Sequence, residues 1–482
     1  MRRALPLILV LASLGCEDEV RYPILLESRL EASEVFADPE TECAECHPDH
    51  VAEWRISNHA YGARDPAFIA MAQVGQAQTN GKLGTFCTSC HAPAAEALGM
   101  TPLFFDEVRR RHNQRVKGLN QAATQGVSCN VCHSITEVLD TKNAKFVMSP
   151  DGIQRGSIRD PIPNEAHESK YAPEFSNSII CAPCHSVVNG KGALIEQTYV
   201  EWQFSSFAAK GQHCQSCHMP SYRGRTVPDG PERELHRHYM VGVDVSLLPP
   251  DEFPGYYEMR ELTAALLREA AKFTVTFDSA TDHLEAVVVN LAGHALPSGA
   301  TADRQVWIEI IVTDEDGNEV FTSGTLDARG DVKDSLPEHN LEAGEDPYLA
   351  YYGQQPLFVP ALVDVEDPAK VNAIRAQVSA ACLPTGLGVT DDTVEAMPVT
   401  FPWQANWQCE SLIPADGSAR ARYPMNALAP GSYTASAKLF YRTFPPHVMR
   451  KLEQLGGMDP MVKERVPIVK MAEELVRFRI DP

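Results

Sequence analysis

Cys43-Ala44-Glu45-Cys46-His47 is the first of five copies of one motif, Cys-x-x-Cys-His, and these copies decide how the chain folds. The other four are Cys87-Thr88-Ser89-Cys90-His91, Cys129-Asn130-Val131-Cys132-His133, Cys181-Ala182-Pro183-Cys184-His185 and Cys214-Gln215-Ser216-Cys217-His218. On a helical turn, two thiols three residues apart can reach the two vinyl groups of one porphyrin, while the adjacent imidazole binds its iron. Cysteine pairs also occur in disulfides and zinc sites, but neither needs a histidine after the second cysteine each time. The sequence therefore predicts five covalently attached haems of the c type.

Each residue of these motifs has a predicted role. The thiols that attach the porphyrins are those of Cys43, Cys46, Cys87, Cys90, Cys129, Cys132, Cys181, Cys184, Cys214 and Cys217. The proximal iron ligands are His47, His91, His133, His185 and His218. These ten cysteines leave three of the chain's 13, namely Cys16, Cys382 and Cys409. In an oxidising compartment Cys382 and Cys409 can form a disulfide, and the alternative is two separately buried thiols.

The first sixteen residues predict export. Met1-Arg2-Arg3 precedes an apolar run, residues 4–12, that is too short for a permanent transmembrane helix. Ser13-Leu14-Gly15-Cys16 then resembles a bacterial lipobox, with Ser13 where leucine is usual. Either Cys16 carries a lipid that anchors the chain in a membrane, or an ordinary signal peptide is cleaved there. We expect a periplasmic or cell-surface protein. If Cys16 carries a lipid, Glu17 after it favours the outer membrane as the membrane in which that lipid is inserted.

The chain is strongly acidic, with a formal net charge of -22 at pH 7. Haem propionates would make it more negative still. Such a charge bears on solubility and partners rather than on the fold. It argues against nucleic acid as a partner and favours other redox proteins with cationic surfaces.

The residues around the motifs and those after them follow different patterns. Modest helical signals at 48–60, 66–74 and 101–116 are joined by Gly- and Pro-rich loops, which predicts small helices around stacked haems. Beyond residue 250, alternating β-branched runs predict strands at 272–277, 284–290, 305–312, 319–321, 432–441 and 474–480. Two further helices are expected at 257–272 and 446–455.

These patterns predict an α+β chain, in which a mainly α-helical multihaem cytochrome domain with little regular structure precedes a C-terminal β-sandwich-like domain. The predicted parts are a signal peptide (1–16), a linker (17–37), the pentahaem domain (38–250), a linking helix (251–271) and the β domain (272–482). Residues 341–398 have no sustained period. They form either an insertion in the sandwich or a surface excursion over the haems.

The ligand in the sixth position of each iron decides whether a haem carries electrons or performs chemistry. Eleven histidines lie outside the motifs: His50, His59, His112, His167, His213, His236, His238, His283, His294, His339 and His447. We count His112 among the ligands, although for it and for His213 a purely structural role weighs equally. His236 competes with His238, and His50 is expected to be solvated.

Two blocks resemble the multihaem cytochrome c families related to hydroxylamine oxidoreductase and its tetrahaem electron acceptor. One is the Cys43-to-Ala60 block, where Trp54, Ser57 and His59-Ala60 follow the first motif, and the other is Gly126-Val127-Ser128 joined to the third motif. The resemblance covers about residues 38–245. It implies that His59, His167 and His238 are distal ligands, each to a haem elsewhere in the stack.

The segment Gly293-His294-Ala295-Leu296-Pro297-Ser298-Gly299 resembles a Gly-His-x-x-Pro-Thr/Ser-Gly loop of β domains appended to multihaem cytochromes. The resemblance implies that His294 reaches back to a haem and docks the β domain on the stack. The alternative is a structural turn whose histidine only forms local hydrogen bonds.

Electron transfer along five mostly bis-histidine haems is the predicted function, with other redox proteins as donor and acceptor. The chain has no Cys-x-x-Cys-Lys motif, nucleophile elbow, phosphate loop or dinucleotide fingerprint, so no catalytic residue is assigned. A second hypothesis is an oxidoreductase with one five-coordinate haem acting on a small nitrogen or sulfur compound, near Arg64, Arg223 or Arg225. A third gives the β domain the main role, as a docking module.

Overall fold

The computed structural model describes residues 22–27, 35–99, 125–334, 345–382 and 395–482. Several predictions from the sequence lie outside these residues. They are the signal peptide with Cys16, most of the linker 17–37, the helix at 101–116 and the ligand His112.

Short helices carry the first half of the chain. They are α2 (Pro48–Trp54), α3 (Asn58–Tyr61), α4 (Pro66–Gln78), α5 (Thr88–His91), α6 (Pro93–Ala97), α8 (Cys129–His133), α9 (Thr198–Gln203), α10 (Ser206–Ala209) and α11 (Cys214–His218). Proline opens α2, α4 and α6, where its missing N–H is not needed. The helix predicted at 48–60 is two helices, because the extended Ser57 accepts a hydrogen bond from the backbone N–H of Ala60 and caps α3.

The first half also contains strands that the sequence analysis did not predict. They form small sheets: β1 (Ile24–Leu25), β3 (Phe146–Met148) and β2 (Ile135–Val138); β4 (Ile153–Gly156) with β5 (Glu168–Tyr171); β6 (Val187–Val188) with β7 (Leu194–Glu196); and β8 (Ser221–Arg225) with β9 (Glu232–His236). Strands of two to five residues are too short to show a period of two. The expectation of a mainly helical first half is therefore only partly right.

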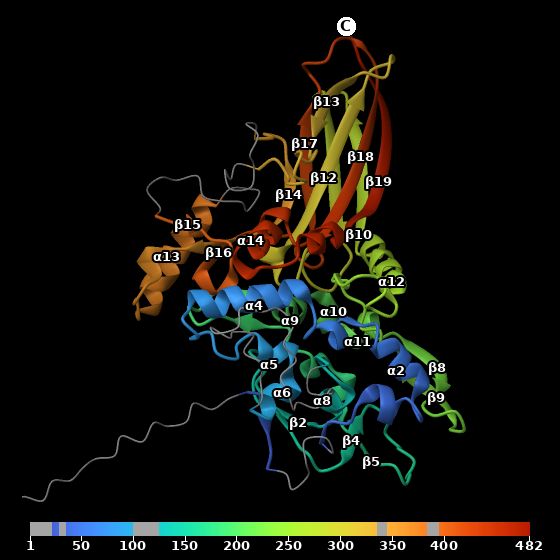
Figure 1. The fold of residues 1–482 in the computed structure, drawn as a ribbon. Helices are drawn as coiled ribbons and strands as arrows, with labels where there is room; N and C mark the ends of the chain where they lie inside the picture. Colours follow the sequence, from blue (N-terminus) through green and yellow to red (C-terminus); the bar gives the residue numbers. More distant parts are fainter. Residues whose placement is uncertain (1–21, 28–34, 100–124, 335–344, 383–394) are drawn as a thin grey trace, which may run out of the picture.

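The second half begins with α12 (Tyr256–Glu269) and consists mostly of two sheets (Figure 1). One has the order β10 (Ala271–Asp278), β11 (His283–Asn290) and β17 (Ser418–Pro424). The other joins β15 (Met397–Pro398), β14 (Ala350–Phe358), β12 (Arg304–Thr313), β18 (Gly431–Thr443) and β19 (Ile468–Ile480), with β13 (Glu319–Ser323) on β12 and β16 (Trp407–Ser411) on β14. The strands and both helices predicted for this half are confirmed to within a few residues, and the chain is α+β.

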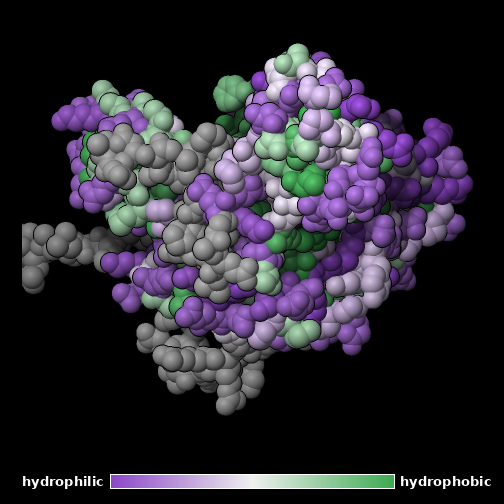
Figure 2. All heavy atoms as spheres, turned by 90° about the horizontal axis from the view of Figure 1, so that it is seen from above, coloured by the Kyte–Doolittle hydropathy of each residue, from purple (hydrophilic) through white to green (hydrophobic). Residues whose placement is uncertain are grey.

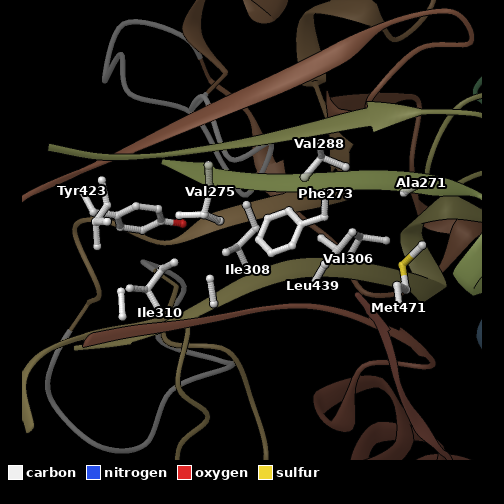
Figure 3. Packing of buried hydrophobic residues seen from close by; sticks show 14 of the residues in the cluster. Ala271, Phe273, Val275, Val288, Val306, Ile308, Ile310, Tyr423, Leu439 and Met471 are labelled. Carbon is white, nitrogen blue, oxygen red and sulfur yellow. The ribbon is translucent and has the colours of Figure 1, made fainter. Parts of the chain in front are cut away.

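Buried side chains from both sheets form one core (Figure 3). Strand β11 alternates between buried and half-buried residues, so one face carries Leu284, Ala286 and Val288 into the core. From the other sheet, β12 contributes Ile308 and Ile310. This alternation is the period of two that the sequence displays.

The segment with no clear period is partly an extension of the larger sheet. Strand β14 pairs with β12 and β16, and α13 (Pro368–Ala381) follows it. Cys382, after α13, is joined to Cys409 of β16 by a disulfide, with 5.6 Å between the Cα atoms. The disulfide confirms the pairing that the sequence allowed.

The two halves are in contact through a hydrophobic cluster. Helix α14 (Pro446–Gly456) of the second half packs on α4 of the first, where Leu452 and Val448 meet Ala67 and Val74 (Figure 1). Gly456 permits this close approach, because a Cβ atom there would lie 2.9 Å from the carbonyl oxygen of Ala70. Further polar contacts, described below, join the same two halves.

The surface is largely hydrophilic. Hydrophilic residues dominate the face seen from above in Figure 2. Among the helices of the described residues, none has both the length and the apolar character needed to cross a membrane.

Replacing the fully buried Leu452 with alanine should lower the free energy of unfolding by about 2–5 kcal/mol, because it leaves a cavity between α14 and α4. The matched control is Leu455→Ala on the same helix, where the side chain is 51% exposed and the loss should be within about 0.5 kcal/mol. Chemical unfolding of the haem-loaded protein, followed by circular dichroism, measures both. Equal losses in the two variants would show that the α4–α14 contact does not stabilise the protein.

Candidate haem sites

The five motifs adopt helical turns, and we number them sites 1 to 5 in chain order. The backbone N–H of the motif histidine donates to the carbonyl of the first cysteine at site 1 (2.8 Å), site 2 (3.2 Å) and site 4 (3.1 Å). The motifs of sites 3 and 5 lie within α8 and α11. All ten motif thiols are free. Both thiols and the imidazole therefore have the local geometry that one covalently attached haem requires.

Four of the motif histidines face a second histidine across a nearly constant gap. The distances between ring centres are 6.2 Å for His47–His167, 6.3 Å for His59–His185, 6.4 Å for His133–His238 and 6.3 Å for His218–His294. A metal–imidazole bond of about 2 Å, plus about 1.1 Å from nitrogen to ring centre, puts two imidazoles on opposite sides of one iron about 6.3 Å apart. The four gaps fit a haem iron.

The competing histidines are not placed in this way. His236 directs Nδ1 to the carbonyl oxygen of Met219 (2.7 Å), and His213 accepts hydrogen bonds from Ser178. The centre of the His50 ring lies 6.1 Å from that of the His47 ring. The two residues are only three positions apart in the chain, as neighbours on one helix face are, so both rings approach from one side. Of the three, only His50 lies near the iron-bridging separation from a motif histidine, and its ring is also 4.7 Å from that of His238.

Hydrogen bonds fix the tautomer of most of these rings. Nδ1 donates to a backbone carbonyl in His47 (Thr226, 2.8 Å), His91 (Gly62, 3.2 Å), His133 (Arg155, 2.5 Å), His218 (Val241, 2.5 Å), His167 (Glu168, 3.2 Å), His238 (His236, 2.9 Å) and His294 (Ala295, 3.0 Å). When Nδ1 carries the proton, Nε2 has a free lone pair and is the atom available to bind iron.

Burial favours the same neutral form. Loss of hydration lowers the pKa of His59 and His218 to about 4 and that of His238 to about 3, with neighbouring histidines adding to the effect. These rings are neutral near pH 7, as metal ligation requires.

The two sequence blocks that carry the family resemblance pack on one another. The indole N–H of Trp54 donates to the carbonyl of Val127 (2.9 Å), and the N–H of Val127 donates to the carbonyl of His59 (2.8 Å). Gly126 has a φ of +72°, and a Cβ atom there would lie 2.1 Å from the His59 carbonyl oxygen. Because glycine has no Cβ atom, the two backbones can approach this closely, and the hydrogen bond from Val127 then holds the backbone of His59 in place.

Residues 226–244 link the sites, and sequence reasoning missed this because the link is mostly backbone. Three of its atoms touch imidazoles of other segments. The Thr226 oxygen contacts the ring of His47, the Met240 sulfur that of His59, and the Val241 oxygen that of His218. The segment also provides His238, whose backbone N–H donates to Glu53 of α2 (2.6 Å). Glu53 also pairs with Arg237 (2.6 Å), so α2 fixes the position of this ligand.

The loop that carries His294 is held by the first half of the chain. The carboxylate of Glu201 in α9 accepts from the backbone N–H of Ala295 (3.0 Å) and from the hydroxyl of Ser298 (2.6 Å). Asn290 also donates to the carbonyl of His294 (2.7 Å). These contacts bring a histidine of the second half to His218 of the first.

Site 2 differs from the others. Among the described residues, no imidazole faces His91 across the distance found at the other four sites, and His112 lies outside these residues. The ring of Phe68 stacks on that of His91, with 3.9 Å between centres and an interplanar angle of 6°. Of the arginines considered for a cationic pocket, Arg223 pairs with Glu232 and Arg225 donates to the Pro228 carbonyl, both in the β8–β9 hairpin.

The motif thiols show which sites are neighbours. Thiols of different motifs lie close enough to shift one another's pKa: Cys43 with Cys129, Cys90 with Cys184, and Cys181 with Cys214. Site 1 therefore adjoins site 3, and site 4 adjoins sites 2 and 5. Cys132 of site 3 is also close enough to Cys184 of site 4 to raise its own pKa, although burial is the larger cause.

Comparison with known proteins agrees with this geometry. Residues 42–134 match the family described as cytochrome c554 and c-prime. Among solved structures, the chain is similar to a penta-haem cytochrome c552 from Thermochromatium tepidum, with 18% sequence identity and a TM-score of 0.55 over 92% of this chain and 100% of that chain. No protein of curated function matches it. The family match covers the first and third motifs and the residues between them, and the structural likeness shows a shared fold.

Gly126→Ala should displace His59 and convert one low-spin haem to high spin, because a Cβ atom at this position collides with the His59 carbonyl. Gly152→Ala is the control: its φ is +76° and nothing lies within 4 Å, so it carries only the left-handed strain of about 1 kcal/mol. Electron paramagnetic resonance of the oxidised, haem-loaded variants tests this. Unchanged spin states in Gly126→Ala would rule out the clamp on His59.

Proposed function

We propose that this chain is an extracytoplasmic pentahaem electron carrier in which at least four haems have two histidine ligands. The observation that carries the proposal is the set of four imidazole pairs, each separated by 6.2–6.4 Å. An iron with both axial positions filled has no open site for a substrate, and it suits electron transfer. Bound haem supplies one-electron chemistry, and the chain holds, orients and shields it.

The proposed ligand pairs assign each distal histidine to a haem, which the sequence alone does not allow. The pairs are His47 with His167 at site 1, His133 with His238 at site 3, His185 with His59 at site 4, and His218 with His294 at site 5. At sites 1, 3 and 5, the carbonyl groups that accept from Nδ1 orient the rings and raise their basicity.

The proposed route for electrons follows the thiol contacts. Because each thiol attaches a porphyrin edge, contacts between the motifs of sites 1 and 3, 2 and 4, and 4 and 5 support short distances between the corresponding haems. The exposed motif cysteines are Cys46 of site 1 and Cys217 of site 5. We place the exchange of electrons with redox partners at these two sites.

The second half has a structural role in the proposal. Its two sheets share one core and form a β-sandwich-like domain, and its loop supplies the sixth ligand at site 5 through His294. For the first half, the resemblance to cytochromes related to hydroxylamine oxidoreductase supports a multihaem domain with histidines as distal ligands. The boundary between the two domains falls near residue 250.

The proposed location follows from the sequence. Residues 1–16 have the features of an export signal, and Ser13-Leu14-Gly15-Cys16 is similar to a lipobox. We therefore propose a periplasmic or cell-surface protein that is anchored to the outer membrane by a lipid on Cys16. Its partners are redox proteins, and its acidic surface favours cationic ones.

Site 2 supports a second candidate function, an oxidoreductase with one five-coordinate haem. Among the described residues, His91 has no opposing imidazole at the iron-bridging distance. The sixth position of its haem is proposed either for His112, which lies outside these residues, or for a small nitrogen or sulfur compound. The spin state of this haem separates the two functions.

Replacing His294 with alanine tests the proposal where it depends on both halves. One low-spin signal should disappear from the electron paramagnetic resonance spectrum of the oxidised protein, and a high-spin signal of about one iron should replace it, because site 5 loses its sixth ligand. The control is His283→Ala on β11, whose ring only bonds the nearby Thr281 carbonyl and which should leave the spectrum unchanged.

An unchanged spectrum in His294→Ala would reject this ligand and reduce the loop to a structural turn. In the unmodified protein, five low-spin irons would identify an electron carrier. A high-spin iron that persists in both proteins would favour the second function at site 2.

A further inference from the structure

We infer that the haem between His59 and His185 has the highest reduction potential of the four paired haems, and that Met240 sets this potential. The inference rests on the ligand pairs of the proposed function and adds a residue that tunes one of them. Its basis is what the Nδ1 atom of each ligand contacts.

Site 4 is the exception in a consistent pattern. At sites 1, 3 and 5, both imidazoles of each pair donate Nδ1–H to a backbone carbonyl. At site 4 neither does so. The Nδ1 of His59 contacts the thioether sulfur of Met240, and the ring of the exposed His185 has no hydrogen-bond partner among the described residues.

This difference alters the iron through its ligands. An imidazole that donates a hydrogen bond to a carbonyl gains electron density, which stabilises the ferric state and lowers the reduction potential. A thioether sulfur is only a weak acceptor. The iron at site 4 therefore has the least stabilised ferric state of the four.

The position of Met240 is built into the segment 226–244. Met240 has a φ of +44°, in the left-handed region that a non-glycine residue seldom adopts. Its neighbours are fixed on both sides, because the N–H of His238 donates to Glu53 and the carbonyl of Val241 accepts from His218. The strained backbone is thus held where it directs the sulfur at His59.

The position of site 4 among the other sites explains what a high reduction potential of its haem would do. Its thiols contact those of sites 2 and 5, and its neighbour on the third side is site 3. A haem of high potential at this junction collects electrons from the surrounding haems. The step would move one electron from a ferrous haem at site 2, 3 or 5, which becomes ferric, to the ferric iron at site 4, which becomes ferrous, and no bond is formed or broken.

The test places an oxygen acceptor at the position of the sulfur. Met240→Gln is similar in length and puts a carbonyl oxygen near Nδ1 of His59, whereas Met240→Leu puts no acceptor there. The proteins are poised at a series of potentials and examined by electron paramagnetic resonance. His59→Ala, which converts the signal of site 4 to high spin, identifies that signal among the five.

In the unmodified protein, the signal of site 4 should be the first of the paired haems to be reduced. Met240→Gln should shift its oxidised-to-reduced ratio about tenfold toward oxidised at fixed potential, equivalent to 59 mV for one electron. Met240→Leu should leave the haem at least as easily reduced as before. Met461→Gln, at a side chain that is 56% exposed, controls for the substitution and should change nothing.

Two results would overturn the inference: another paired haem is reduced before site 4, or Met240→Gln leaves the ratio unchanged. If Met240→Gln does not accumulate, the order of reduction in the unmodified protein decides. Failure of the proposed ligation looks different, because His59→Ala would then produce no high-spin signal.

Discussion

A haem iron with two histidine ligands requires two imidazole rings about 6.3 Å apart on opposite sides of a porphyrin, and four imidazole pairs of this structure have that separation. The rings of each pair come from distant parts of the chain, such as His47 with His167 and His59 with His185. Short helices and loops can meet this requirement only if their backbone is held elsewhere. In the first half, hydrogen bonds to Val127, Glu53 and the segment 226–244 perform this task.

The contact between the two halves follows from the same constraint. His294 can oppose His218 only while the second half is docked, and Glu201 holds the loop in place. The hydrophobic packing of α14 on α4 supports the docking at a separate position. Haem ligation and packing between the halves are therefore coupled at site 5, and disruption of either weakens the other.

The sequence predicted some features of this protein well, for identifiable reasons. The covalent chemistry of haem attachment demands a fixed local spacing, so the attachment cysteines and the motif histidines can be assigned from five short motifs, and this assignment stays a prediction. Long strands such as β11 and β18 repeat their burial every second residue, so they were also predicted. The disulfide between Cys382 and Cys409 was expected as one of two alternatives.

Other features could not be predicted because their sequence signal is weak or absent. The pairing of distal histidines depends on contacts between residues more than 70 positions apart, such as His218 and His294, and periodicity does not encode such contacts. The carbonyl groups of Thr226 and Val241 act through the backbone, so their side chains give no sign of it. The break at Ser57 depends on a cap that the helical pattern of residues 48–60 conceals.

Anomalous diffraction at the iron absorption edge, from crystals of the haem-loaded protein, locates each iron relative to the paired imidazoles. We expect five iron peaks, four of which lie midway between the rings of His47 and His167, His133 and His238, His185 and His59, and His218 and His294. Iron peaks away from these midpoints, with the paired rings turned elsewhere, would contradict this expectation.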